Sequence, residues 1–160
     1  MKTIFESERL RYVEPSELLV KDYLAMVNDI EGVARWIGRR TEPVSEEKEL
    51  SWVRKKLAEK APLFSMLEKD GGAFVGNIEL MDATESEAEL GIAITADKQN
   101  LGYGTEAVAA VTRYTLETLG LRRIFLKAYP DNLRAIRVYE KCGYRETGRT
   151  EEDVFMERTR

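Results

Sequence analysis

The most restrictive feature of the chain is a glycine-rich turn between a strand-like run and a helical one, Gln99-Asn100-Leu101-Gly102-Tyr103-Gly104-Thr105. Glycine has no Cβ atom, so a ligand can approach the backbone closely at such a turn. The helix that follows offers unpaired N–H groups and the positive end of its dipole. Together these features predict a strand–turn–helix unit that binds a pyrophosphate-like anion.

Hydrophobic periodicity places this turn within a mixed α/β (α+β) fold. Helices are expected from Ser16 to about Ile30, from Ser45 until Pro62, and over residues 104–119 and 132–141. A period of two predicts strands over residues 9–13, 63–68, 73–81, 88–95, 122–129, 144–148 and 154–158. The expected order is βααβββαβαββ, in a single domain over residues 1–160. Tight hairpins such as Lys69-Asp70-Gly71-Gly72 make the central sheet mostly antiparallel.

Composition excludes several kinds of chemistry. The 160 residues contain no histidine and one cysteine, Cys142. Neither a Ser-His-Asp triad nor a His-bearing zinc site can form, and no metal is expected. The net charge of −4 gives no support for a nucleic-acid partner. No signal peptide and no apolar run of membrane-spanning length is visible, so no membrane partner and a cytoplasmic location are expected.

The spacing Gly102-x-Gly104-x-x-Ala107 also matches a dinucleotide-binding fingerprint. That fingerprint belongs at the start of a βαβ unit, with an acidic residue about 20 positions later. Here it follows antiparallel strands, and the stretch 122–129 carries Arg122, Arg123 and Lys127 instead of an acid. A nicotinamide enzyme is therefore a weaker interpretation, as is a glycine turn that binds nothing.

Two motifs together resemble the GNAT acetyltransferases. Gln99 to Gly104 matches that family's phosphate-loop pattern, Gln/Arg-x-x-Gly-x-Gly/Ala, at every fixed position. Farther along, Asn132, Ala135, Tyr139 and Gly143-Tyr144 resemble the family's Asn…Ala-x-x-x-Tyr…Gly-Phe/Tyr helix. The opening Glu8-Arg-Leu-Arg11 resembles the subgroup that acetylates ribosomal proteins and polyamines.

The resemblance implies an acetyl-CoA-dependent N-acetyltransferase. The acetyl group would pass to a primary amine, such as a protein N-terminus, a polyamine or another small amine, by direct attack in a ternary complex. Two neighbouring strands would splay at a bulge, and backbone groups of Ile92, Ala93 and Ile94 would pair with the pantetheine. Asn132 would either reach the cofactor or act only as a helix N-cap. Backbone N–H groups would hold the pyrophosphate, from Gln99, Asn100, Leu101, Gly102, Tyr103, Gly104 and Thr105.

The same resemblance assigns catalytic candidates. Tyr139 would lie near the thioester sulfur and donate a proton to the departing thiolate, although a core aromatic that only packs is the alternative. Some relatives carry a glutamate at the position of Lys127, so Glu89 and Glu79 are the candidate bases, with a water chain as a further option. Cys142 is expected to pack and not to act as a nucleophile.

A different class of function stays open. A non-catalytic acyl-CoA sensor or partner module would keep the glycine loop and lack a committed base. The acceptor would be selected by residues 18–36 and by the final hairpin near Thr150. A homodimer is one of the open oligomeric states.

Overall fold

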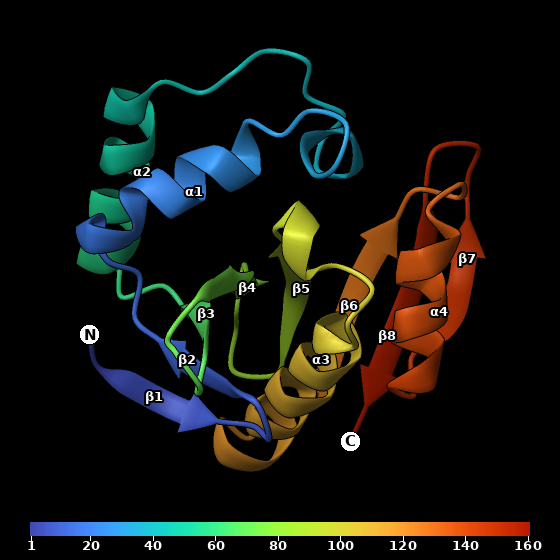
Figure 1. The fold of residues 1–160 in the computed structure, drawn as a ribbon. Helices are drawn as coiled ribbons and strands as arrows, with labels where there is room; N and C mark the ends of the chain where they lie inside the picture. Colours follow the sequence, from blue (N-terminus) through green and yellow to red (C-terminus); the bar gives the residue numbers. More distant parts are fainter.

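The computed structural model describes residues 1–160, and its centre is one eight-stranded sheet (Figure 1). Across the sheet the strands follow the order β1-β2-β3-β4-β5-β6-β8-β7. Every neighbouring pair is antiparallel except β5 and β6, which run parallel. The predicted mixed fold is therefore confirmed. The strands are β1 (Thr3–Glu6), β2 (Leu10–Val13), β3 (Leu63–Glu68), β4 (Phe74–Met81), β5 (Glu87–Ile94), β6 (Arg123–Ala128), β7 (Arg145–Arg149) and β8 (Val154–Thr159).

Four α-helices flank the sheet, at the positions that the periodicity predicts. They are α1 (Val20–Val27), α2 (Glu46–Ala58), α3 (Tyr103–Arg113) and α4 (Leu133–Lys141). Side chains cap two of them: the Ser45 hydroxyl accepts a hydrogen bond from the Lys48 N–H, and the Asn132 side chain accepts one from the Ala135 N–H. None of the helices is both long enough and apolar enough to cross a membrane.

Two apolar clusters lie on opposite faces of the sheet. The larger packs α3 and α4 against the sheet and includes Val108, Tyr139 and Leu126. The smaller packs α1 and α2 against the other face and includes Tyr23 and Val53. Because side chains alternate along a strand, β4 and β5 contribute to both clusters. The sheet thus carries a different set of helices on each face (Figure 1).

The structure corrects the predicted elements at two places, the start of the chain and the end of the third helix. β1 precedes the first expected strand, so the order is ββααβββαβαββ. β1 is a short edge strand, and its Phe5 ring stacks between Tyr12 and Tyr114 at 4.3 and 4.4 Å. A strand of only four residues shows too little alternation of apolar and polar side chains to be recognised from the sequence. The expected helix over 104–119 is α-helical only to Arg113, and a π turn covers Tyr114–Thr118.

The sheet opens between β5 and β6. Their parallel pairing covers only three residue pairs, from Glu87↔Arg123 to Glu89↔Phe125, and the strands then diverge (Figure 1). On the other side, β5 stays fully paired to β4 as far as Ile94. The pairing of β4 with β3 shifts register next to Gly76, and on its other side Gly76 lies very close to the backbone of β5. A Cβ atom at Gly76 would lie only 2.0 Å from the Ala93 carbonyl oxygen.

Gly76→Ala is expected to destabilise the protein by about 1–3 kcal/mol, because the added methyl group forces β4 and β5 apart. The free energy of unfolding in urea measures this effect. Gly148→Ala is the matched control, since no atom lies within 4 Å of its Cβ position. We expect that control to change stability by less than about 1 kcal/mol. Equal losses in the two variants would contradict the close approach at Gly76.

Candidate functional site

The open edge of β5 presents backbone groups to the gap. Successive residues of a strand direct their N–H and C=O groups to alternate sides. The Ala93 carbonyl faces Gly76 of β4, so Ile92 and Ile94 face the other way, towards β6. Because β6 has already diverged, these groups have no strand partner. Of the three residues expected to pair with pantetheine, Ile92 and Ile94 are oriented for it, whereas the backbone of Ala93 is taken up by β4.

The glycine loop lies at the C-terminal end of this edge. Asn100 and Gly102 both have positive φ values, 62° and 86°, and Gly102 is the N-cap of α3. The first intrahelical bond runs from the Glu106 N–H to the Gly102 carbonyl. The N–H groups of Tyr103, Gly104 and Thr105 therefore have no intrahelical acceptor. They form the donor set expected for an anion.

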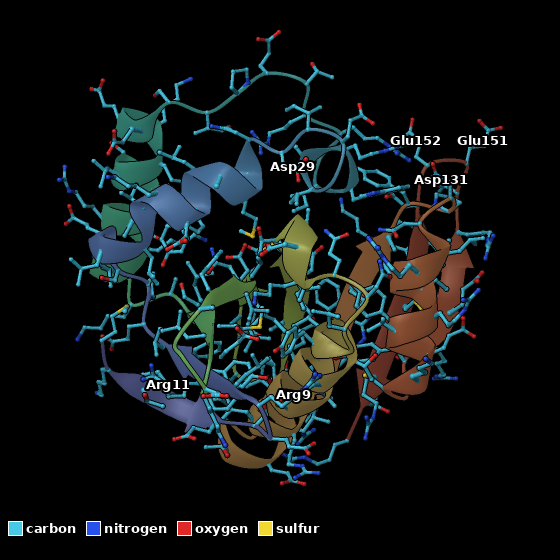
Figure 2. The ribbon with its side chains drawn as sticks, viewed as in Figure 1. Arg9, Arg11, Asp29, Asp131, Glu151 and Glu152 are labelled. Carbon is cyan, nitrogen blue, oxygen red and sulfur yellow. The ribbon has the colours of Figure 1, made fainter.

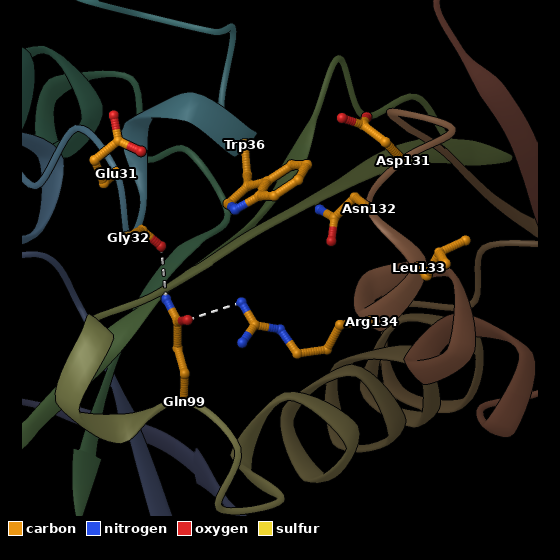
Figure 3. Close-up of a pocket in the computed structure, with 8 residues that line it drawn as sticks. All are labelled: Glu31, Gly32, Trp36, Gln99, Asp131, Asn132, Leu133 and Arg134. Carbon is orange, nitrogen blue, oxygen red and sulfur yellow. Dashed lines mark hydrogen bonds between the residues drawn. The ribbon is translucent and has the colours of Figure 1, made fainter.

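Gln99 ties this loop to two other segments (Figure 3). Its Nε2 donates to the carbonyls of Gly32 and Ile94 at 3.0 and 2.9 Å, and its Oε1 accepts from the Arg134 guanidinium at 2.8 Å. Its backbone N–H donates to Ala96 within the protein. The Gln99 backbone N–H is thus already paired in this structure and its side chain positions the loop, so its expected contact with a cofactor stays a prediction.

Like Gln99, the ion pair between Arg9 and Glu106 holds the loop in place, and Arg9 lies beside α3 (Figure 2). The Arg9 Nε donates to Glu106 at 2.7 Å, and its guanidinium reaches the Leu101 carbonyl at 3.0 Å. The Glu106 carboxylate also accepts from the Arg9 backbone N–H and the Ser7 hydroxyl. Burial alone would raise the pKa of Glu106, but these hydrogen bonds outweigh it and lower that pKa.

A third set of contacts joins the loop to Glu68 at the end of β3. The Tyr103 hydroxyl donates to the Glu68 carboxylate, and Lys98 pairs with the same carboxylate at 2.9 Å. The hydrogen bonds from Tyr103 and Lys98 lower the pKa of Glu68. The Arg9 guanidinium also stacks over the Tyr103 ring at 4.2 Å. The loop conformation is therefore fixed from several directions before any ligand arrives.

Tyr139 faces the same gap from α4. Its side chain is almost fully buried, yet its hydroxyl makes no hydrogen bond within the protein and the residue lines a cavity. Burial raises the pKa of Tyr139 to about 12. Cys142, one turn later, packs beneath the loop with its Sγ 3.5 Å from the Thr105 carbonyl oxygen. Burial raises the pKa of that thiol, which disfavours the nucleophilic thiolate.

One cavity of about 670 Å³ connects these groups. It passes through the open sheet, so its lining includes the glycine loop and Tyr139 on one face and Glu79 and Glu89 on the other. Glu79 pairs with Lys56 of α2 at 3.1 Å. Glu89 forms no ion pair or side-chain hydrogen bond. Of the two candidate bases, only Glu89 has an uncommitted carboxylate.

Sequence reasoning missed the wall opposite the glycine loop. Asn77 on β4 lines the cavity, and its Oδ1 accepts a hydrogen bond from Ser65, which in turn contacts Tyr23 of α1. Trp52 of α2 also lines the cavity, although the acceptor region was expected to end near Trp36. The β7–β8 hairpin near Thr150 contributes nothing to the lining. The signal in the sequence that could have revealed this wall was the presence of polar residues within expected strands, such as Ser65 and Asn77.

A smaller cavity of about 420 Å³ adjoins the first, between the α1–α2 connection and the β6–α4 loop (Figure 3). Trp36 and Asp131 lie on its two sides. The Arg39 guanidinium bridges the same two segments, since it pairs with Asp131 at 2.7 Å and stacks on Tyr129 at 3.8 Å. Asn132 lines both cavities while serving as the N-cap of α4.

Comparison with known proteins assigns this arrangement to a class. A family model described as an acetyltransferase (GNAT) domain matches residues 9–145. The uncharacterized N-acetyltransferase YnaD of Bacillus subtilis is 30% identical over 105 residues. That match covers 65% of this chain and 62% of YnaD, which is less than two thirds of the relative's length.

Solved structures show the same fold. A GNAT-family acetyltransferase from Bacillus anthracis superposes with a TM-score of 0.85 at 22% identity, covering 96% of both chains. Spermidine N-acetyltransferase from Vibrio cholerae, in complex with CoA and spermine, gives a TM-score of 0.82 at 18% identity, covering 94% of this chain and 95% of that one. The mixed sheet of this chain is thus shared with solved acetyltransferases. The chain belongs to the GNAT acetyltransferase family.

Glu106→Gln is expected to reduce stability by roughly 1–3 kcal/mol at neutral pH, because it removes the charge that pairs with Arg9. Since the folded-state pKa of Glu106 is lowered, its contribution is present above the unfolded pKa of about 4.3. The contribution is lost as the pH falls through the folded-state value. Urea unfolding at about pH 7 and about pH 3.5 should therefore show the difference from wild type shrinking in acid.

The exposed Glu117, whose side chain makes no contact of this kind, provides the control as Glu117→Gln. Its unfolding free energy should follow wild type at both pH values. A Glu106→Gln deficit that is the same in acid as at neutral pH would show that the charge of Glu106 is not what stabilises the loop.

Proposed function

We propose that the protein, acting as one unit over residues 1–160, transfers an acetyl group from acetyl-CoA to a primary amine. The observation that carries this proposal is one continuous cavity joining the unpaired edge of β5, the donor groups of the glycine loop, Tyr139 and Glu89. A site that only stored a ligand would need neither a tyrosine hydroxyl that faces the cavity without a protein partner nor an uncommitted carboxylate on the opposite face.

The residues that line the cavity match the successive parts of the donor, acetyl-CoA. The backbone groups of Ile92 and the N–H of Ile94 are free to pair with amides of an extended chain, as in strand addition, whereas the Ile94 carbonyl already accepts from Gln99. Tyr103, Gly104 and Thr105 supply N–H groups for a pyrophosphate. Arg134 and Arg137 add positive charge to the same part of the cavity. When bound, acetyl-CoA supplies an acyl group activated as a thioester.

Residues on the two faces of the sheet carry out different proton transfers. An alkyl ammonium with a pKa of about 10.4 has no lone pair, so it must first lose a proton, and Glu89 accepts it. A C–N bond forms as the C–S bond breaks, and the Ile92 N–H stabilises the negative charge that develops on the carbonyl oxygen. Tyr139 stays protonated at neutral pH and donates to the departing sulfur, and the second proton that the nitrogen loses as the amide forms restores the Tyr139 hydroxyl through solvent.

The activity itself is tested by mixing the full chain with acetyl-CoA and a panel of amines, and measuring free CoA thiol. Release above the amine-free rate for at least one acceptor is expected. Binding of acetyl-CoA by calorimetry with no release for any acceptor would instead favour a non-catalytic acyl-CoA sensor. Failure to bind CoA at all would remove the basis of both functions.

Tyr139→Phe should lower kcat by about 10²-fold or more, because the departing sulfur loses its donor. The affinity for acetyl-CoA, measured by calorimetry, should change little. Tyr144→Phe is the matched control, since that hydroxyl bonds Thr112 at 2.7 Å and does not line the cavity. An unchanged kcat in Tyr139→Phe would exclude the proposed donor role.

Glu89→Gln should lower kcat by about 10²-fold or more at neutral pH, with partial recovery at higher pH where more amine is already neutral. Glu79→Gln should cost less, because Lys56 already neutralises that carboxylate. Glu87→Gln, two residues along the same strand and paired with Arg123, should retain full activity. Rate measurements across pH for the three variants distinguish the roles, and a larger loss in Glu79→Gln would reverse the assignment.

A further inference from the structure

The part of the cavity facing α1 and α2 has a largely apolar wall, hereafter the acceptor wall. It is built from α1, the α1–α2 connection, α2, β3 and β4, through Met26, Val33, Trp36, Trp52, Leu63 and Met81. Both tryptophans of the chain are among these residues. Large apolar and aromatic side chains gain free energy by covering an apolar ligand, and the Trp52 ring already faces the Lys56 ammonium ion.

Only two acidic side chains line the whole cavity, and one of them is already neutralised. Glu79 and Lys56 form their ion pair with side-chain exposures of only 23% and 21%. The Lys56 ammonium also lies 5.8 Å from the centre of the Trp52 ring, so it is held from two directions. Glu89 is therefore the one acidic group that is free to receive an ammonium ion.

The other charged side chains that line this cavity itself are positive. Lys127 lines it from β6, and Arg134, Arg137 and Lys141 line it on the side of the glycine loop, where Lys98 is already paired with Glu68. A polyamine would have to bring its second and third ammonium groups against apolar residues or near these cations. Burying a charge without a partner is costly, and like charges repel. The wall accommodates one ammonium ion next to an uncharged body.

We infer that the acceptor is a primary monoamine with an apolar, aromatic body, of the arylalkylamine class, and not a polyamine. This inference rests on the proposed acetyl transfer to a primary amine. The amino group would lie at Glu89, towards the opening between β5 and β6. The aromatic body would pack against Trp52 and Met81. Spermine, bound in the complex of the Vibrio cholerae neighbour, is the opposite kind of amine.

The first experiment compares acceptors with the wild-type full chain and saturating acetyl-CoA. Phenethylamine should give a kcat/KM at least about tenfold above that of spermidine or spermine. A peptide with an N-terminal phenylalanine tests whether the apolar amine is presented by a polypeptide instead. A polyamine or the peptide as the better acceptor would overturn the inference.

Two variants test the physical cause. Lys56→Met releases the Glu79 carboxylate, so the ratio of spermidine to phenethylamine kcat/KM should rise by about tenfold. Lys55→Met is the matched control, because Lys55 is exposed on the same helix and pairs only with Glu59, and it should leave the ratio unchanged. Trp52→Ala should lower kcat/KM for phenethylamine and leave that for ethylamine nearly unaffected. A ratio that does not move in Lys56→Met would mean that charge balance does not select the acceptor.

Binding separates this inference from the transfer activity. Because both tryptophans line the acceptor wall, phenethylamine added to the CoA-bound protein should change their fluorescence, with or without turnover. Saturable binding of phenethylamine that exceeds binding of spermidine supports the acceptor class even if no acetyl transfer occurs, in which case only the proposed function fails. Tighter binding of spermidine, or no binding of phenethylamine, would refute the acceptor class.

Discussion

The early separation of β6 from β5 is the constraint on which the site depends. Main-chain donors and acceptors inside a protein are almost always paired, so an open ladder in the middle of a sheet is tolerated only where something else can complete it. Here β5 keeps its bonds to β4 through Ile94, and the close approach at Gly76 holds that pairing tight. The exposed edge is consequently rigid, and the cavity passes from one face of the sheet to the other.

The glycine loop lacks the strand pairing that holds β5. A turn with positive φ angles and unpaired N–H groups has no local hydrogen bonding that would keep it in one conformation. Distant parts of the chain supply the restraint: Arg9 from the β1–β2 turn, Glu68 from the end of β3 and Gly32 from the α1–α2 connection. These contacts fix the donors in advance, so that a ligand loses less free energy in ordering them. Three segments from the first half of the chain therefore hold this one short loop.

The elements with strong periodicity were predictable, and so was the glycine loop. Predicted strands such as 63–68 coincide with those observed, because alternation and turn residues agree there. β1 was missed because four edge residues are held by the stacking of Phe5 on distant rings, which no local pattern encodes. Likewise Gln99 matches a binding motif by type, yet its hydrogen bonds to Gly32 and Arg134 depend on tertiary contacts. The Lys56–Glu79 pair could not be foreseen either, since 23 positions separate its members.

The two sides of the cavity draw on different stretches of the chain. Apart from strand residues, the acceptor wall comes from residues 26–52, whereas the loop, Asn132 and Tyr139 come from residues 98–141. Substitutions in the first stretch can reshape one binding surface while the other keeps its geometry. Because the two surfaces are separate, substitutions can change which acceptor is selected without an intermediate sequence that no longer binds the donor. Gln99 is the exception, since its bond to Gly32 links the two stretches and limits how far they can diverge independently.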